Sequence, residues 1–459
     1  MTDTQTFDAI VIGAGGAGDP LARDLANAGK RTLLVERDKP GGTCTNTGCT
    51  PSKTAEASAR IAHLARNARQ WGIEVGEVRT NLTAVQKHKD SIIDCYRNDT
   101  QQAFDETPNL RQVLGEARFT APGQVAVRHR SGDEFAATAP IVVVNTGTRP
   151  AVPSVEGIES VPYWNSTDAL NATALPEHLL VLGGNYIGVE LAQTFCRFGS
   201  RVTLVESGPH ILPNEDEDIA QGVTEALQNE GITFRIGARA VRISGDAGQM
   251  RLELEDGEIL TGTHLLGATG RNPNTEALNL SLAGVQTNEA GFVQTNARLE
   301  TSAPGVWAAG DVAGSPQFSH IAFDDYRVLK SQLLGDGART TEGRLVPYVV
   351  YTDPPLGRVG LSETEAKHQN RRYKIATVPM TEAAFPIENN ETTGLVKVLI
   401  DLDTDRLLGA ACFGLQGDAL STVVHTAMLG GVTARQLSEA TFAHPTLAET
   451  MGDLLCRAG

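Results

Sequence analysis

The sequence is poor in basic residues, in cysteine and in long apolar runs, and each shortage excludes a class of protein. Lysine and arginine number 39 against 55 aspartates and glutamates, which gives a net charge of −16. A surface this acidic repels phosphate backbones and anionic lipids, so we expect no nucleic acid partner and no membrane partner. No stretch reaches the roughly 18 consecutive apolar residues of a membrane-spanning helix. Six cysteines in 459 residues are too few for a secreted disulfide scaffold.

The N-terminus also lacks the basic and cleavable apolar segments of a secretion signal. Residues 7–12 already have the pattern of the first strand of a domain, so we expect a cytoplasmic protein. The chain is about three times the ~150 residues typical of one domain, which predicts two or more domains.

A glycine-rich turn follows this first apolar segment. Three glycines complete the pattern G-x-G-x-x-G, namely Gly13, Gly15 and Gly18. A helical pattern and a second strand follow, and the second strand ends at Glu36. The glycines permit a tight turn and the close approach of a pyrophosphate to a helix N-terminus, while the acid can accept a hydrogen bond from a ribose hydroxyl. The segment therefore predicts dinucleotide binding.

The same arrangement occurs a second time, which indicates an internal duplication. Residues 179–182 form the strand, Gly183 and Gly188 occupy two of the glycine positions, and Glu206 ends the following strand. Asn185 replaces the middle glycine. Since asparagine tolerates unusual backbone angles, we expect a strained backbone there rather than a lost site. The alternative is a structural relic that binds nothing.

Two further apolar strands, residues 141–144 and 306–309, each end in a glycine turn. Doubly wound α/β sheets place their ligands at such strand ends. The chain is therefore expected to contain a first domain (1–150), an inserted second domain (151–270), a return to the first domain (271–343) and a C-terminal region (344–459).

Cys44 and Cys49 lie close together in sequence, and paired cysteines in a cytosolic chain indicate redox chemistry or metal binding. A helical pattern begins near Ser52, so Cys49 should lie near a helix N-terminus, where the dipole and free amides stabilise a thiolate. This favours a reactive disulfide, with metal binding and inert thiols as alternatives. We expect the remaining cysteines to be buried small apolar side chains: Cys95, Cys196, Cys412 and Cys456.

Beyond these two dinucleotide motifs, the segments GGTCTNTGCTPSK, GDVAG and FAHPTLAE resemble those of the flavoprotein disulfide reductases. This family of pyridine nucleotide-disulfide oxidoreductases includes dihydrolipoamide dehydrogenase, glutathione reductase and mercuric reductase. The resemblance covers essentially the whole chain. It implies two Rossmann-like α/β domains, one for FAD and one for NAD(P), followed by a C-terminal α+β domain that forms a homodimer.

The resemblance also assigns cofactor-binding residues. For FAD they are Gly13, Gly15, Gly18 and Glu36 at the adenosine diphosphate, Thr43 and Lys53 beside the flavin, Gly147 after a supporting strand, and Asp311 at the ribityl chain. For the nicotinamide nucleotide they are Gly183, Gly188, Glu206 and Tyr186. Tyr186 matches an aromatic that covers the nicotinamide pocket in several members, and a plain packing tyrosine is the alternative. Glu190 matches the ion-pair partner of Lys53, and a solvated helix residue is its alternative.

The same resemblance assigns catalytic roles. Cys49 matches the thiol that contacts the flavin, and Cys44 matches the exposed interchange thiol that attacks the substrate. His444 and Glu449 match a proton-transferring pair that reaches the cysteines of the other subunit. A carboxylate on one imidazole nitrogen fixes the tautomer and raises the basicity of the other nitrogen.

These residues predict an enzyme that passes electrons from NADH through FAD to a Cys44–Cys49 disulfide and on to a disulfide substrate. We expect NADH rather than NADPH, because Glu206 would repel a 2′-phosphate. The segments GAGGAGDPLA and RLVPYVVYTDPPLGRVGLSE resemble the mercuric-reductase-like subgroup, so reduction of Hg(II) or Cu(II) by the same dithiol is the alternative. Outside this class, an FAD- and NADPH-dependent monooxygenase would share the dinucleotide motifs but would need neither the cysteine pair nor His444 and Glu449.

Overall fold

The computed structural model describes residues 4–456, and the chain forms two compact units. The first unit contains the chain up to Thr54, residues 87–151 and residues 270–344. The second unit contains residues 55–86, 152–269 and the chain from Leu345 onward. The helices α3 (Cys49–Asn67) and α4 (Leu82–Asp105) contribute residues to both units. The expected boundaries of three separate domains stay a prediction.

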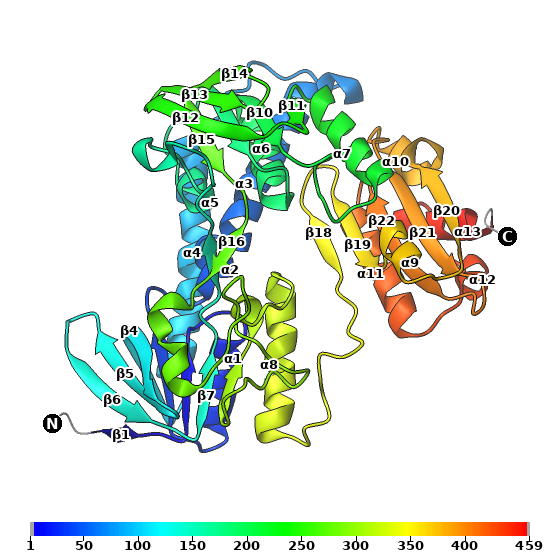
Figure 1. The fold of residues 1–459 in the computed structure, drawn as a ribbon. Coiled ribbons are helices and arrows are strands. Elements are labelled where there is room, and N and C mark those ends of the chain that lie inside the picture. Colours follow the sequence, from blue (N-terminus) through cyan, green and yellow to red (C-terminus); the bar gives the residue numbers. More distant parts are fainter. Residues whose placement is uncertain (1–3, 457–459) are drawn as a thin grey trace. The chain divides into compact units, whose positions relative to one another are not determined.

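An eight-stranded sheet forms the centre of the first unit, in the order β1-β6-β5-β4-β3-β2-β7-β17 (Figure 1). Its strands are β1 (Gln5–Thr6), β2 (Ala9–Ile12), β3 (Thr32–Glu36), β4 (Leu110–Ala121), β5 (Gln124–His129), β6 (Glu134–Thr138), β7 (Ile141–Val144) and β17 (Val306–Ala308). Whereas β5 pairs antiparallel with β4, the strands β4, β3, β2, β7 and β17 run parallel to one another. Their carboxyl ends therefore share one edge, where doubly wound folds bind ligands.

Two helices cover the parallel part of this sheet and pack against each other, α1 (Gly18–Asn27) and α8 (Ser319–Leu334) (Figure 1). The apolar stripe expected on α1 is buried at Leu21, Ala22, Leu25 and Ala26. Because β2 and β7 are covered on both faces, they consist almost entirely of buried Ile, Val and Ala rather than alternating side chains.

The second unit contains a parallel sheet of four strands in the order β11-β10-β9-β15. These are β9 (His178–Leu182), β10 (Arg201–Glu206), β11 (Thr233–Ile236) and β15 (His264–Gly267), with α6 (Tyr186–Phe198) and α7 (Glu217–Asn229). Its smaller three-stranded sheet consists of β12 (Ala240–Asp246), β13 (Gln249–Leu254) and β14 (Ile259–Gly262).

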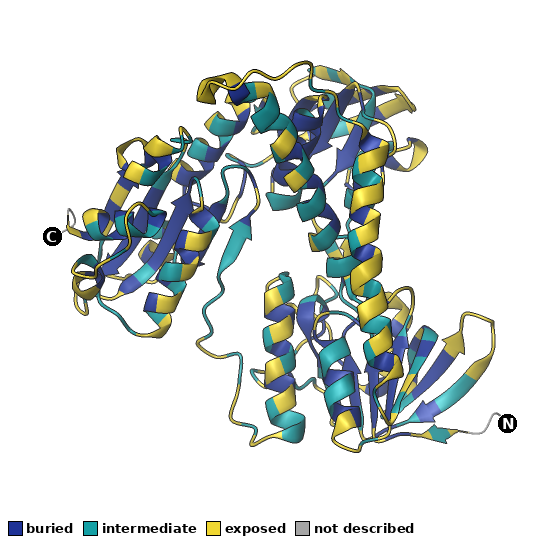
Figure 2. Cartoon of the chain, turned by 180° about the vertical axis from the view of Figure 1, so that it is seen from behind, coloured by how far each residue is buried: buried dark blue, intermediate teal, exposed yellow. Residues whose placement is uncertain are grey.

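The C-terminal part of this unit has a five-stranded antiparallel sheet in the order β18-β19-β22-β21-β20. Its elements are β18 (Tyr348–Val350), β19 (Leu356–Gly360), β20 (Tyr373–Pro379), β21 (Leu395–Asp401), β22 (Leu407–Phe413), α11 (Gly417–Leu429) and α12 (Ala434–Ser438). In both units the buried residues concentrate on the strands and on the helix faces that cover them (Figure 2).

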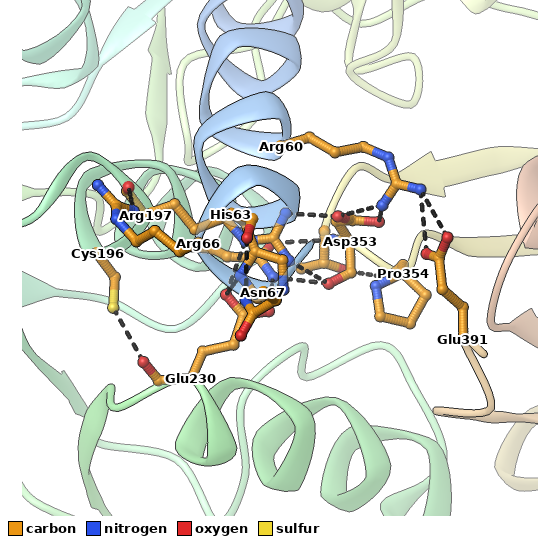
Figure 3. A network of polar contacts seen from close by, with 12 residues as sticks. Arg60, His63, Arg66, Asn67, Cys196, Arg197, Glu230, Asp353, Pro354 and Glu391 are labelled. Carbon is orange, nitrogen blue, oxygen red and sulfur yellow. Dashed lines mark hydrogen bonds and ion pairs between the residues drawn. The ribbon is translucent and has the colours of Figure 1, made fainter. Parts of the chain in front are cut away.

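A network of ion pairs within the second unit fixes the C-terminal part of α3 (Figure 3). Arg60 on this helix donates to Asp353 at 2.6 Å, and Asp353 also pairs with Arg197 on α6. Arg197 in turn donates to Glu230 at 2.7 Å and is only 5% exposed. Although burial raises the pKa of Asp353, the two guanidinium groups lower it below its ordinary value. One carboxylate therefore ties α3 to α6 and to the turn before β19.

The structure confirms the α/β fold class, and it corrects two expectations about single residues. Asn185 has φ −80° and ψ 175°, so its backbone is unstrained and the expected strain is wrong. It is instead the N-cap of α6, and its side-chain oxygen accepts from Tyr186 N. Cys95 and Cys456 are exposed rather than buried, because they lie on the solvent-facing sides of their helices. Cys412 is buried as expected, and Cys196 is half-buried.

Over residues 4–456, no helix combines the length and the apolar character needed to cross a lipid bilayer.

Candidate active site

The first glycine motif forms a turn between β2 and α1 that leaves no room for side chains. Gly13 has φ +103°, and a Cβ there would lie 2.3 Å from the carbonyl oxygen of Asn145. A Cβ on Gly18 would lie 2.0 Å from the carbonyl oxygen of Gly13. Gly15 has an ordinary φ, but a Cβ would lie 3.1 Å from the Asn145 amide oxygen. These glycines are required by close backbone approach, as a turn that receives a pyrophosphate needs.

Asn145, directly after β7, completes this turn, and the sequence analysis did not identify it as a site residue. Its side-chain oxygen accepts from Gly18 N at 2.9 Å, and its side-chain nitrogen donates to Ala309 O at 2.7 Å. The residue is 7% exposed. Its position as the first polar residue after a buried apolar strand is the signal that could have identified it.

The second glycine motif repeats this geometry in the other unit. Gly183 has φ +106°, and a Cβ there would lie 2.5 Å from Ala268 O. A Cβ on Gly188 would lie 2.0 Å from Gly183 O, the same close approach as in the first motif. Because the second turn keeps this packing, the alternative of a degenerate relic has no support from its backbone.

The acid at the end of each second strand is hydrogen-bonded to its own glycine turn. Glu36 accepts from Ala14 N at 2.8 Å, and Glu206 accepts from Gly184 N at 2.7 Å. The second oxygen of Glu206 accepts from Gly208 N at 2.6 Å. Both carboxylates are therefore fixed beside the turn, where an adenosine ribose lies in dinucleotide-binding folds. The two turns and their acids fit the FAD and NAD(P) expected from the sequence.

Other residues predicted to contact FAD surround the first turn. Thr43 lies on α2 (Gly42–Asn46), and a Cβ on Gly42 would lie 2.8 Å from Gly15 Cα, so α2 packs directly on the turn. Gly147 has φ +64° in open space, where the backbone conformation itself favours glycine. Asp311 accepts from the Thr148 hydroxyl at 2.6 Å.

A buried carboxylate on α8 holds the segment that carries Asp311. Asp325, which is 0% exposed, accepts from Gly310 N at 2.8 Å and from the Ser315 hydroxyl at 2.7 Å. Its other oxygen accepts from Arg344 at 2.6 Å. Since Gly310 begins the short 3-10 helix η5 (Gly310–Ala313) and Ser315 lies two residues after it, this single side chain holds the segment at both ends.

Cys44 and Cys49 occupy two successive helices close to the first turn. Cys44 lies on α2, and Cys49 is the first residue of α3, which confirms the expected helix N-terminus. Both are thiols in this structure, with Cys44 half-buried and Cys49 exposed. The expectation that Cys44 is the exposed thiol is therefore not met, since Cys49 is the more exposed of the two, and the interchange role of Cys44 stays a prediction.

The two thiols differ in acidity. The hydrogen bond from Cys44 is the largest effect and lowers the pKa of Cys49 to about 6; burial, the next largest, raises it, and the Ser319 hydroxyl and the positive charge of Lys53 lower it further. The same contact with Cys49, together with burial, raises the pKa of Cys44. The first negative charge of the reduced pair therefore resides on Cys49, at the N-terminus of α3.

Ser319 is a second residue that the sequence analysis missed. Its hydroxyl lies 3.1 Å from Cys49 Sγ, although the two residues are 270 positions apart in sequence. It is the first residue of α8, and the only sequence signal is its position shortly after GDVAG.

The predicted ion pair of Lys53 and Glu190 would join residues of different units, so it stays a prediction. Within its own unit, Glu190 is 6% exposed and accepts from Tyr351 N at 2.7 Å. The alternative of a solvated helix residue is therefore wrong. Tyr186, the first residue of α6, is half-buried against the apolar core of the second unit, which is consistent with either role considered for it.

His444 and Glu449 contact each other in the second unit. The carboxylate oxygens lie 3.1 and 2.9 Å from His444 Nδ1. The histidine side chain is 68% exposed, whereas Glu449 is only 23% exposed. The neighbouring Leu447 is 2% exposed and anchors this segment in the core. The carboxylate therefore orients the ring, and Nε2 is left to act on an external group.

Comparisons with known proteins agree with this combination of turns, thiols and C-terminal sheet. The chain belongs to the pyridine nucleotide-disulphide oxidoreductases: the model of that family matches residues 7–325, and the model of the family's dimerisation domain matches residues 346–455. This membership distinguishes the chain from the monooxygenase alternative. It confirms the use of FAD and NAD(P)H, and the dimerisation domain supports a homodimer.

The chain is similar over nearly its whole length to several members of the family. It is 35% identical over 452 residues to the probable pyridine nucleotide-disulfide oxidoreductase RclA of Escherichia coli strain K12, covering 98% of both chains. It is 32% identical over 449 residues to a mercuric reductase of Staphylococcus aureus, covering 96% of this chain and 81% of that one. The structure of the Cu(II) complex of the HOCl-induced flavoprotein disulfide reductase RclA from Escherichia coli superposes with a TM-score of 0.91 at 34% identity, covering 99% of this chain and 100% of the other. The protein is thus an NAD(P)H-dependent flavoprotein oxidoreductase.

Proposed function

We propose that Cys44 and Cys49 are the redox-active pair through which this oxidoreductase reduces a disulfide substrate. The observation that supports this most directly is the arrangement of the thiols beside the first glycine turn, with the pKa of Cys49 lowered to about 6. A thiolate populated at neutral pH is the reactive form in thiol–disulfide exchange.

The cofactors would be held by the residues of the two turns. Gly13, Gly18, Glu36 and Asp311 would hold FAD, and Gly183, Gly188 and Glu206 would hold NADH. When bound, FAD supplies the transfer of an electron pair from NADH to the Cys44–Cys49 disulfide. Lys53 and Glu190 contribute charge near that transfer. The two glycine turns orient the cofactors and exclude side chains from the pyrophosphates.

Substrate reduction then needs only the thiols and a proton donor. His444 takes up the Cys44 proton as the Cys44 sulfur attacks one sulfur of the substrate disulfide; the substrate S–S bond breaks, a mixed disulfide forms, and His444 returns the proton to the departing substrate sulfur. The Cys49 thiolate then attacks Cys44 Sγ, the mixed disulfide breaks, the Cys44–Cys49 disulfide re-forms, and the second substrate sulfur leaves as a thiolate that takes a proton from water. Glu449 holds His444 in the tautomer that this transfer requires.

We further propose that His444 serves the cysteines of the other subunit of a homodimer in the cytoplasm. The 68% exposure of this oriented imidazole supports the proposal, since an external group is what it can reach. The test mixes Cys44→Ser chains with His444→Ala chains under conditions that exchange subunits. Each parent homodimer should be nearly inactive, and removing the imidazole should lower the rate of disulfide turnover ~10²–10⁴-fold. The mixed dimer should recover up to half of the wild-type activity per dimer. Verified mixed dimers without recovery would show that His444 does not act across the interface.

Reduction of a metal ion by the same dithiol is the second candidate function. The similarity to mercuric reductases and to a reductase solved as a Cu(II) complex supports it. Initial rates of NADH oxidation with oxidised glutathione, lipoamide, Cu(II) and Hg(II) distinguish the two functions. The His444→Ala variant adds a mechanistic test: it should lose less activity with a metal ion than with a disulfide, because a metal ion has no leaving thiol that needs a proton.

A further inference from the structure

The hydroxyl of Ser319 is in contact with the reactive thiol. It lies 3.1 Å from Cys49 Sγ, within the range of a hydrogen bond to sulfur. Ser319 is the first residue of α8, and the preceding N-cap residue, Phe318, makes no side-chain capping bond. The hydroxyl therefore lies at the N-terminal end of α8 with the Cys49 sulfur within hydrogen-bonding distance.

The backbone of Ser319 is held in place by its surroundings in the first unit. The helix that it begins packs against α1 and the 3-10 helix η5. A Cβ on Gly16 would lie 3.6 Å from the carbonyl oxygen of Ser319, so this end of α8 is in contact with the first glycine turn. Asp325, two turns further along α8, is tied to Gly310 and Ser315. The approach of the hydroxyl to Cys49 is therefore set by packed backbone rather than by a flexible loop.

We propose that Ser319 is a further catalytic residue, whose hydroxyl donates a hydrogen bond to the Cys49 thiolate of the reduced enzyme. This rests on the proposed redox role of the Cys44–Cys49 pair. When two electrons break the disulfide, one sulfur takes up a proton as a thiol and the other remains a thiolate. A thiolate can only accept, so the hydroxyl must donate, and it keeps its own proton throughout.

The hydrogen bond has a different strength in the two redox states. A disulfide sulfur carries no charge and is a weak acceptor, whereas a hydrogen bond to a charged group is among the stronger ones in proteins. Ser319 therefore stabilises the reduced pair relative to the disulfide. It also lowers the pKa of Cys49, in the same direction as the positive charge of Lys53.

The test compares Ser319→Thr, which keeps the hydroxyl, with Ser319→Val, which replaces it by a methyl group of similar size. Ser319→Ala is the third variant. Each FAD-loaded enzyme is reduced, and iodoacetamide labelling of Cys49 is followed against pH by peptide mass spectrometry. The labelling of exposed Cys456 is the internal control. We expect the pKa of Cys49 to rise by about one to two units in the Val and Ala variants and to stay near the wild-type value in the Thr variant.

A redox titration supplies the second measurement. In dithiothreitol buffers, the equilibrium between dithiol and disulfide should shift about tenfold or more toward the disulfide in the Val variant but not in the Thr variant. Equal pKa values and equal equilibria for the Thr and Val variants would overturn the proposal. A wild-type Cys44–Cys49 pair that forms no disulfide in oxidised dithiothreitol would instead overturn the redox role on which it rests, so the two failures are distinguishable.

Discussion

Replacing Asp325 by Asn should destabilise the first unit and weaken its hold on FAD. The carboxylate is 0% exposed and accepts three hydrogen bonds, from Gly310 N, the Ser315 hydroxyl and Arg344. An amide of the same shape has one oxygen and one donor group. If its oxygen faces Gly310, its nitrogen meets the Arg344 guanidinium. If its oxygen faces Arg344, its nitrogen meets the Gly310 N–H and no acceptor remains there.

The magnitude follows from these contacts. Removing one partner of a buried ion pair costs about 3–5 kcal/mol. Arg344 is 17% exposed and regains some hydration, so we expect the lower end, about 3 kcal/mol in the free energy of unfolding of the apoprotein. The displaced turn carries Asp311, so the Kd for FAD should also rise. It should rise about tenfold for each 1.4 kcal/mol of FAD-binding free energy that is lost.

Urea unfolding of the apoprotein and fluorescence titration with FAD measure the two effects. Asp324→Asn is the matched control, because Asp324 is the preceding residue on α8 and pairs with Arg339 and, at 3.5 Å, with Arg344 nearer the surface. The control should lose at most about 1 kcal/mol. If Asp325→Asn unfolds at the same urea concentration as the control and binds FAD as tightly as wild type, Asp325 does not hold the segment around η5 in the way proposed.

Two further predictions concern the reactive thiol and the nucleotide. The pKa of Cys49 is lowered to about 6, so the rate at which iodoacetamide labels Cys49 in the reduced enzyme should be nearly constant from pH 8 to 7. Below about pH 6 this rate should fall tenfold per pH unit. A midpoint near the ordinary thiol value of 9.0 would contradict the prediction. NADH should be preferred over NADPH by ~30- to 1000-fold in kcat/KM. Glu206 is held by two backbone amides, and its carboxylate accepts from a 2′-hydroxyl but repels a 2′-phosphate. Comparable kcat/KM values for the two nucleotides would show that this carboxylate does not face the ribose.

The parts of the site that could be predicted from the sequence are those encoded by short spacings. Each glycine turn and its acid lie within one βαβ unit, and His444 and Glu449 are five residues apart, so local patterns and the family resemblance were sufficient. The glycine pattern did not predict the backbone of Asn185, because an N-cap side chain fills this position without a positive φ.

The residues that the sequence analysis missed act over long sequence separations. Asn145 joins Gly18 to Ala309, and Asp325 joins Gly310 and Ser315 to Arg344. None of these contacts follows a helical or strand period, so only the folded chain brings the partners together. The exposed Cys95 was predicted wrongly for a related reason: an isolated cysteine carries no signal of the helix face on which it lies.

The distance along the chain between Cys49 and Ser319 has a consequence for biosynthesis. The serine is translated 270 residues after the cysteine. At about 5–20 residues per second, the nascent chain carries both thiols of the pair for roughly 15 to 50 seconds before α8 exists to pack beside them. During that interval neither the hydroxyl nor the packing of α8 on the first glycine turn can influence which disulfide forms. We expect correct maturation to depend on surroundings that keep thiols reduced until translation has passed α8, so that the pair first oxidises in a completed first unit.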